Sequence, residues 1–240
     1  MEYYDLDVKS NFSIGEHTVS QMAAFAQSLG WKGIVVCDLY KDSATLDNLN
    51  SECKEASEKT GIEVYSGVTI QPKDPKELKK LVSETRDKVM LLIVQGGTYQ
   101  INRAACENPY VDILMSPEQN RPDNGLDEPC FTAAQINGVS IGLNFRQLLN
   151  TYRKIRSRLL DFSKINIKLC KKYAVPLVVV SGAQSMMDMR DPRQLVSIAN
   201  VLGMDLPHAF NLLSSIPQQI IEKNQKRLEG KIIGKGVEKV

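Results

Sequence analysis

Short apolar runs alternate with helix-length stretches along most of the chain, and this alternation constrains the fold more than any other feature. Seven runs are predicted as strands: residues 3–8, 33–38, 62–70, 89–95, 112–116, 139–144 and 177–181. Those at 33–37 and 177–180 are continuously apolar rather than alternating. A strand has this pattern when both of its faces are covered, as in a parallel sheet flanked by helices.

The stretches between these runs have helical patterns and helix-boundary residues. Helices are predicted at residues 18–29, 45–60, 75–86, 126–137, 152–173 and 192–202. Asp74 and Asp191 each stand directly before a proline, which is a typical helix start because the proline occupies a position that needs no N–H. Gly61 and Gly138 follow helical stretches, where a left-handed residue commonly ends the helix.

Strands and helices in this order predict βα units with right-handed crossovers, in either a closed barrel or an open doubly wound sheet. We favour an α/β barrel of the TIM type with about seven parallel strands, because no glycine-rich dinucleotide turn follows the first strand and the units are short and even. Two further helices are expected after Gly203, where an eighth unit would stand. Residues 1–229 are expected to form a single barrel domain and residues 230–240 a flexible Gly/Lys-rich tail.

Composition excludes several classes of protein. No apolar run approaches the roughly 20 residues that span a bilayer, and the first residues lack the pattern of a signal peptide, so a cytoplasmic protein is expected. The five cysteines lie far apart without a CxxC pair, which is typical of reduced, buried thiols and not of a zinc site.

Catalytic groups of a barrel enzyme lie where the strands end. Here these positions hold Asp7, Asp38, Gln95, Ser116, Asn144 and Ser181. The chain has two histidines, His17 and His208, and neither ends a predicted strand, so a His-rich dinuclear metal centre and a histidine-activated nucleophile are excluded. Magnesium held by Asp7 and Asp38 remains as an alternative, and it would make the chain a stand-alone metal-dependent phosphoesterase.

The predicted helix at 152–173 carries the most distinctive charge pattern. One face is predicted to be apolar and to consist of Ile155, Leu159, Phe162, Leu169 and Tyr173, with Asn166 among them. The rest of its surface is rich in cations: Arg153, Lys154, Arg156, Arg158, Lys164, Lys168, Lys171 and Lys172. Asp161 is the only acid in this helix, whereas residues 42–84 are rich in acids. Although the net charge is only +2, the charges are therefore expected to be unevenly distributed, with one flank of the surface suited to a polyanion.

A series of motifs with a characteristic order and spacing covers nearly the whole chain. They are YDL at 4–6, GWKG at 30–33, DILMSP at 112–117, RPDNGL at 121–126, IGLNFRQLL at 141–149, NIKLCKKYAVP at 166–176, VSGAQS at 180–185, DMRDPR at 188–193 and LGM at 202–204. In this combination the sequence resembles the ribonuclease P protein component 3 family, the archaeal counterparts of a subunit of the eukaryotic enzyme.

The resemblance implies a barrel related to the histidinol-phosphatase and polymerase-associated phosphoesterases, with aspartates at 5 and 7 where those relatives carry histidines. It implies a subunit of the ribonuclease P holoenzyme, which removes the 5′ leader from precursor tRNA by chemistry that the RNA and its magnesium carry out. Implied partners are ribonuclease P RNA, protein component 2 as the direct protein partner, components 1 and 4 in the same particle, and precursor tRNA. No cofactor of the protein is implied.

Candidate RNA contacts come from two sources. Those matched to the motifs are Arg121, Arg146, Lys168, Lys172, Arg190 and Arg193. Those taken from the charge pattern are Arg153, Arg156, Arg158 and Lys164. No catalytic or metal-binding residue is assigned to the chain. A barrel that contacts only proteins is a third hypothesis, beside the RNA-binding subunit and the phosphoesterase.

Overall fold

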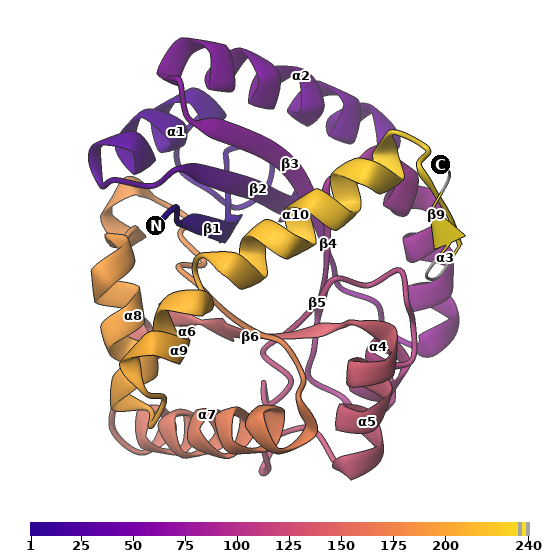
Figure 1. Ribbon diagram of the computed structural model, residues 1–240, viewed down its shortest axis with the longest axis vertical. Helices are drawn as coiled ribbons and strands as arrows, with labels where there is room; N and C mark the ends of the chain where they lie inside the picture. Colours follow the sequence, from indigo (N-terminus) through magenta and orange to yellow (C-terminus); the bar gives the residue numbers. More distant parts are fainter. Residues whose placement is uncertain (235–236, 239–240) are drawn as a thin grey trace.

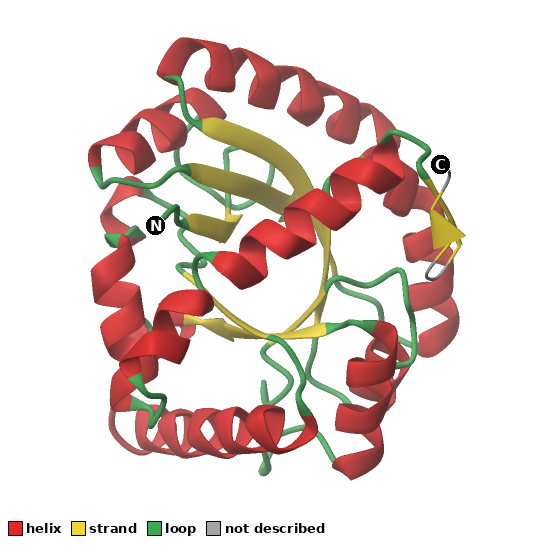
Figure 2. Ribbon diagram, viewed as in Figure 1, coloured by secondary structure: helices red, strands yellow, loops and turns green. Residues whose placement is uncertain are grey.

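The predicted strands form one curled parallel sheet. The computed structural model describes residues 1–234 and 237–238. Its main sheet has seven strands in sequence order and forms a nearly closed barrel, as Figure 2 shows. The strands are β1 (Tyr4–Val8), β2 (Gly33–Leu39), β3 (Glu63–Ile70), β4 (Leu91–Gln95), β5 (Ile113–Met115), β6 (Ser140–Asn144) and β7 (Leu177–Val180). The prediction of a TIM-like barrel is confirmed.

Helices surround this sheet (Figure 1). They are α1 (Val19–Ser28), α2 (Ser43–Thr60), α3 (Pro75–Thr85), α4 (Tyr99–Cys106), α5 (Glu128–Asn137), α6 (Phe145–Leu149), α7 (Arg153–Tyr173), α8 (Pro192–Val201), α9 (Leu206–Asn211) and α10 (Ser215–Leu228), with 3-10 turns η1 (Arg86–Lys88) and η2 (Met186–Asp188). The sequence analysis missed α4 and α6, which are too short to show a clear apolar period. It also started α5 two residues early, because Asp127 is the cap that accepts a hydrogen bond from the N–H of Cys130.

Helix α2 begins two residues before its predicted start, with Asp42 as its cap, whereas the boundary residues singled out in the sequence are confirmed. The Asp74 carboxylate accepts hydrogen bonds from two backbone N–H groups in the first turn of α3, and that of Asp191 does the same for α8. Gly61 and Gly138 end α2 and α5 with φ of 75° and 68°, in the left-handed region that costs other residues energy.

Buried apolar side chains form two layers. One fills the space between the strands and the surrounding helices, and the other fills the barrel interior. Ile221 of α10 belongs to the interior layer, together with Tyr4 at the start of β1 and Met90 just before β4. The C-terminal helix α10 therefore crosses the end of the barrel where the strands begin (Figure 1). It covers that end without adding an eighth strand to the sheet.

A buried ion pair fixes α10 in this place. The guanidinium of Arg86 donates two hydrogen bonds to the Asp112 carboxylate, at 2.6 and 3.1 Å, and one to the Asn224 side-chain carbonyl at 2.5 Å. Arg227, one turn further along α10, donates to the backbone carbonyls of Arg86 and Val89. These bonds join the last long helix to the segments that precede β4 and β5.

The first and last strands of the barrel meet through few contacts. Val8 and Ala183 form a single parallel bridge, and the Lys9 N–H donates to the Ala183 carbonyl at 2.8 Å. The Asp5 carboxylate accepts a hydrogen bond from the Ser181 N–H at 3.1 Å. The Asp5 side chain thus joins β1 to β7 where the two strands have few backbone hydrogen bonds.

Further expectations concern the cysteines, the tail and membranes. All five cysteines are unpaired and buried, which confirms that part of the sequence analysis. The tail contains a short antiparallel pair, β8 (Ile232–Gly234) with β9 (Val237–Glu238). Residues 235–236 and 239–240 lie outside the described residues, so the flexible tail and the domain limits stay predictions. Among the described helices, none has the length and apolar character to span a membrane.

Candidate nucleic-acid interface

The barrel mouth, where the strands end, contains a pocket of about 280 Å³. Its lining comes from strand ends and the loops that follow them: Asp7, Lys9, Ile14, Leu39, Thr69, Gln71, Gln95, Ser116, Gln119, Asn144, Arg146, Gln147, Asn150, Thr151, Gly182 and Gln184. Neither His17 nor His208 is among these lining residues. The mouth is thus the place where barrel enzymes carry their catalytic groups, and here its lining is mainly uncharged.

A buried lysine occupies the base of this pocket. The Lys9 ammonium lies 2.7 Å from an Asp7 carboxylate oxygen and 2.7 Å from the Thr69 hydroxyl, and it also donates to the Cys37 carbonyl. Burial raises the pKa of the Asp7 carboxyl, and the positive charge of Lys9 opposes that rise. An irregularity in the register of β1 between Asp5 and Val8 precedes Lys9. The ion pair gives the base of the pocket no net charge.

The second mouth carboxylate, Asp38, is also held by groups of the protein. It accepts hydrogen bonds from the Ser10 N–H at 2.9 Å and from the hydroxyls of Ser10 and Ser13. The Lys9 ammonium is paired with Asp7, and three hydrogen-bond donors engage Asp38. These partners do not fit a magnesium ion shared between the two carboxylates. In the part of the chain that the structure describes, no group of three or more His, Cys, Asp and Glu side chains is placed to hold a metal.

Asp5 differs from Asp7 in its surroundings. It lies between β1 and β7 and accepts from backbone N–H groups. Burial raises the pKa of its carboxyl to about 7, against the lowering effect of the hydrogen bonds from Ser181. Asp5 therefore has a structural position in the barrel wall rather than a place in the mouth.

The glycines after β4 form a turn and not an anion site. The N–H of Gly96 donates to the Met115 carbonyl at 2.8 Å, and that of Gly97 donates to the Asn102 side chain at 3.0 Å. Both N–H groups are therefore satisfied within the protein, and neither is available to a phosphate.

Helix α7 confirms the predicted amphipathic pattern only in part. Leu159 is buried, and Leu169 and Tyr173 pack against the core, but Ile155 is 64% exposed. The predicted apolar face is wrong at Ile155 because the first two turns of α7 have no buried residue before Leu159. The buried residues further along the helix are Ser163, Asn166, Ile167 and Cys170. The face in contact with the core therefore lies partly beside the predicted one.

The predicted RNA contacts fall into two groups according to their partners. Within the described residues, five have exposed side chains without a hydrogen bond or ion pair: Arg153, Arg158, Lys164, Lys168 and Arg193. We call these five the open cations. Four of them belong to α7, and Arg193 is in the first turn of α8. An exposed cation without an acidic partner can exchange its hydration for a phosphate at little cost.

The other predicted contacts are engaged within the protein. Arg121 pairs with Asp123 at 2.7 Å, Arg146 with Asp188 at 3.0 Å and Lys172 with Glu128 at 3.0 Å. The guanidinium of Arg156 donates to the carbonyls of Thr151 and Leu149, and that of Arg190 donates to the carbonyls of Met187 and Met189. An RNA phosphate would have to compete with these partners.

Both groups lie on one side of the barrel. The Arg190 guanidinium lies 5.7 Å from the Phe145 ring centroid, which brings the segment before α8 against α6. Asn124 in the loop of Arg121 donates to the Asn166 side chain of α7 at 2.9 Å. Helix α7 is opposite α2 in Figure 1, and α2 carries exposed acids such as Asp47 and Glu55. The structure thus keeps the cationic flank away from the acidic one.

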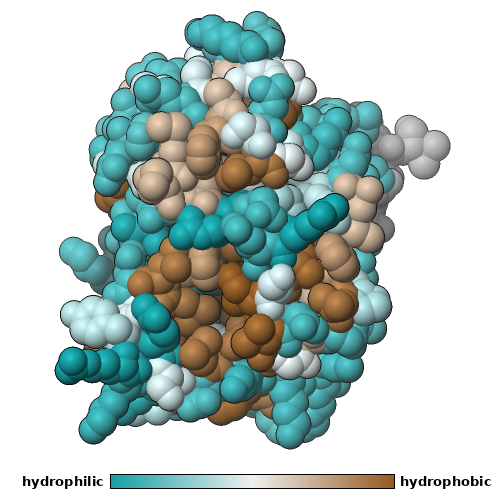
Figure 3. Space-filling model, turned by 90° about the vertical axis from the view of Figure 1, so that its left-hand side faces the viewer, coloured by the Kyte–Doolittle hydropathy of each residue, from teal (hydrophilic) through white to brown (hydrophobic). Residues whose placement is uncertain are grey.

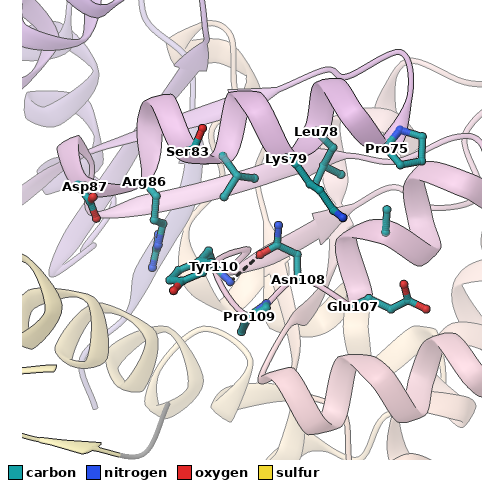
Figure 4. A pocket seen from close by; sticks show the side chains of 12 residues that line it. Pro75, Leu78, Lys79, Ser83, Arg86, Asp87, Glu107, Asn108, Pro109 and Tyr110 are labelled. Carbon is teal, nitrogen blue, oxygen red and sulfur yellow. Dashed lines mark hydrogen bonds between the residues drawn. The ribbon is translucent and has the colours of Figure 1, made fainter. Parts of the chain in front are cut away.

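Two further concave surfaces differ from the barrel mouth in the side chains that line them. An apolar hollow of about 310 Å³ between α6, α7 and α8 is lined mainly by leucine, isoleucine and valine, and Figure 3 shows apolar side chains gathered on the face that carries α8. A groove of about 770 Å³ between α3 and α4 is shown in Figure 4, with Lys79, Asp87 and Glu107 among its lining. Its mixed charges do not favour phosphate, and no predicted RNA contact lines it.

Sequence reasoning missed two features of the mouth. Lys9 was not singled out, although its position two residues after Asp7 was a usable signal. The amide side chains of Gln71, Gln119, Gln147 and Gln184 line the pocket and were not singled out. Each of them lies in a short segment after a strand, where functional side chains of a barrel are expected.

Comparison with known proteins identifies relatives that match nearly the whole of this chain. The chain is 36% identical over 224 residues to Ribonuclease P protein component 3 of Methanosarcina mazei, covering 93% of this chain and 90% of the relative. It is 29% identical over 228 residues to the protein of the same name from Methanothermobacter thermautotrophicus, covering 95% and 91%.

The similar solved structures include one with clear sequence identity to this chain and one that shares only its fold. A chain in the cryo-EM structure of archaeal Ribonuclease P with mature tRNA has 30% identity and a TM-score of 0.83, covering 98% of this chain and 97% of that chain. Histidinol phosphate phosphatase from Lactococcus lactis has 11% identity and a TM-score of 0.56, covering 87% and 94%, and this likeness shows a shared fold alone. The family model described as RNase P subunit p30 matches residues 2–229. This chain belongs to the RNase P subunit p30 family.

Proposed function

We propose that this chain is a protein subunit of ribonuclease P that binds and stabilises the catalytic RNA during removal of the 5′ leader from precursor tRNA. The observation that carries the proposal is the set of open cations on α7 and α8, which have no acidic partner in the described structure. Support comes from relatives that bear the name Ribonuclease P protein component 3 and from the similar chain in an archaeal particle with mature tRNA.

The division of chemistry follows from the barrel mouth. Lys9 and the serine donors already engage Asp7 and Asp38, so these carboxylates are not available to activate water or to hold a metal. We therefore assign cleavage to the RNA and its magnesium ions, and binding to the protein. The cations of α7 would neutralise phosphates and release their counterions, which stabilises a compact RNA.

The partners we propose are ribonuclease P RNA, protein component 2 in direct contact, components 1 and 4 in the same particle, and precursor tRNA as the substrate of the complex. The cytoplasm is the proposed location. Support for the direct protein partner comes from the resemblance to the component 3 family, over the motifs that run from residue 4 to residue 204.

The test is the salt dependence of binding to ribonuclease P RNA. A triple variant with Arg153→Ala, Lys164→Ala and Lys168→Ala removes three open cations from α7. Each phosphate contact contributes about 0.9 to the slope of log K against log salt concentration, so the slope should fall by up to about 3. Because all three side chains are exposed, the unfolding temperature should stay unchanged.

A matched control removes the same charge elsewhere. Lys54, Lys76 and Lys79 are exposed on α2 and α3, and their replacement by alanine should leave the salt slope as it is. Equal slopes for the α7 variant and the wild-type protein would refute the proposed RNA face. Reconstituted precursor-tRNA cleavage with and without the chain then tests the role in the holoenzyme, and unchanged cleavage without it would refute that role.

A further inference from the structure

We propose that the barrel mouth binds one unstacked adenine base of single-stranded RNA. This inference rests on the proposed function, since it names a part of the RNA that the phosphate-binding face does not recognise. It is carried by the ring of amide side chains around the pocket, by the ion pairs that engage each charged side chain of its lining, and by its position beside the start of α7.

The strands from β3 to β7 each deliver an amide to the mouth. Gln71 follows β3, Gln95 ends β4, Gln119 lies in the loop after β5, Asn144 ends β6 and Gln184 lies in the loop after β7. We call these five residues, together with Gln147 of α6, the amide ring. Amides at successive strand ends supply hydrogen bonds without charge, which suits recognition of a ligand better than catalysis.

Half of the amide ring is available to a ligand. Within the described residues, the side chains of Gln71, Gln147 and Gln184 have no hydrogen-bond partner. Gln95 and Gln119 are hydrogen-bonded to each other, and each keeps further donor or acceptor capacity. Each free amide offers one carbonyl acceptor beside one NH₂ donor, a pair that matches the edge of a nucleobase.

Each charged side chain that lines the pocket has a partner of opposite charge, and the partner of Arg146 lies outside the pocket. Lys9 is paired with Asp7, and Arg146 is paired with Asp188 at 3.0 Å. Guanine is recognised chiefly by available Arg or Lys and cytosine by an available carboxylate, whereas Asn and Gln form paired hydrogen bonds with N6 and N7 of adenine. Arg146 is held on Asp188 through its Nε, and of these groups only amides are without any partner here, so the pocket favours adenine.

The size and the walls of the pocket suit a single base. Its volume of about 280 Å³ is just below the roughly 300–1,000 Å³ of ordinary small-ligand sites. Ile14 lines the pocket and is 44% exposed, and Leu39 lines it as well, so apolar side chains are present for the face of the base. A base in this place must leave its stack, which single-stranded RNA permits most easily.

The position of the pocket connects it to the cationic face. Asn150 and Thr151 line the pocket, and α7 begins only two residues later at Arg153. Arg153 is one of the open cations and marks the end of α7 that is nearer to the mouth. A strand whose phosphates lie along α7 therefore has a neighbouring base within reach of the amide ring.

The experiment compares short single-stranded oligoadenylate and oligouridylate of equal length, binding to the full chain at one fixed salt concentration. Fluorescence anisotropy should give about tenfold tighter binding of oligoadenylate. Gln147→Leu and Gln184→Leu replace free amides by side chains of similar size, and each should remove most of that preference while binding of oligouridylate stays the same. Gln135→Leu on the exposed surface of α5 is the control and should keep the preference.

The outcomes separate this inference from the proposed function. Equal binding of the two oligonucleotides, or a preference that survives in both pocket variants, overturns the adenine site and leaves the salt-dependent RNA face standing. If the wild-type chain binds neither oligonucleotide nor ribonuclease P RNA, the proposed function is overturned, and this inference with it. Adenosine 5′-monophosphate provides the last arm: competition as strong as that of the oligonucleotide would assign the pocket to a free nucleotide and overturn the assignment to RNA.

Discussion

Replacement of Lys9 by methionine tests whether an internal ammonium balances the acids of the barrel mouth. The change keeps an unbranched side chain and removes the charge that lies 2.7 Å from the Asp7 carboxylate. Asp7 and Lys9 are 2% and 6% exposed, so both charges are largely removed from solvent. The Asp7 carboxylate would remain buried near Asp38 without a counter-charge.

The expected loss follows from the geometry of the pair. Two unit charges 2.7 Å apart attract each other by about 6 kcal/mol at an effective dielectric constant of about 20. Relaxation and partial protonation of the carboxylate reduce the measured loss, and breaking a buried pair from one side typically costs about 3–5 kcal/mol. Since a domain has about 5–15 kcal/mol of stability, Lys9→Met should be among the most destabilising single changes in this chain.

Urea unfolding followed by circular dichroism measures this loss, at about pH 7.5 and again at about pH 5. Burial already raises the pKa of Asp7, and Lys9 opposes the rise, so removal of Lys9 raises that pKa further. The folded variant then binds a proton that the unfolded chain does not bind, and its free energy of unfolding should increase as the pH falls between these values. The double variant Asp7→Leu with Lys9→Met should recover most of the loss, because neither charge of the buried pair remains.

Two results would contradict this reasoning. A loss below about 1 kcal/mol for Lys9→Met would place the pair among weak surface pairs, contrary to its burial. An equal loss at both pH values would show that the destabilised group is not a carboxyl.

Two more changes test the barrel wall and its interior. The pKa of Asp5 in the folded protein is about 7, against 3.8 for the free side chain. Its contribution to the free energy of unfolding is therefore greatest below about pH 4 and is lost as the pH rises through 7, by up to about 4 kcal/mol. Asp5→Asn should remove most of this pH dependence in urea unfolding at pH 5 and 8, and an unchanged dependence would refute it. Gly67→Ala would place a methyl group against the Cys37 sulfur inside the barrel and should cost about 1–3 kcal/mol. Calorimetric melting should show recovery when Cys37→Ala is added, and no recovery would contradict the packing argument.

The strands of the fold could be predicted because each lies in a short apolar run between helix-length stretches, and the runs at 33–37 and 177–180 are continuous, as in strands covered on both faces. The two missed helices are short, and α6 has no buried residue, so its residues have no core-facing period to detect. Ile155 was misassigned because a period of 3.6 residues identifies a face but not where along a helix contact with the core begins.

The site was less predictable than the fold. Arg153 and Arg121 are alike in sequence, and only the structure shows that Arg121 is paired with Asp123 while Arg153 is open. Lys9 follows a register irregularity in β1, and its position two residues after Asp7 was the only sequence signal of their pairing. Pairing between side chains therefore decided most of what the sequence alone left open.

The position of α10 has a consequence for the order in which the molecule can be completed during synthesis. The barrel end formed by the starts of the strands is covered by residues 215–228, which leave the ribosome after all seven strands. Until then Tyr4 and Met90 face solvent at that end, and the Arg86 guanidinium lacks its hydrogen bond to the Asn224 carbonyl. A chain that stops before residue 215 would keep an uncovered apolar opening, so quality-control proteases would distinguish it from the finished subunit.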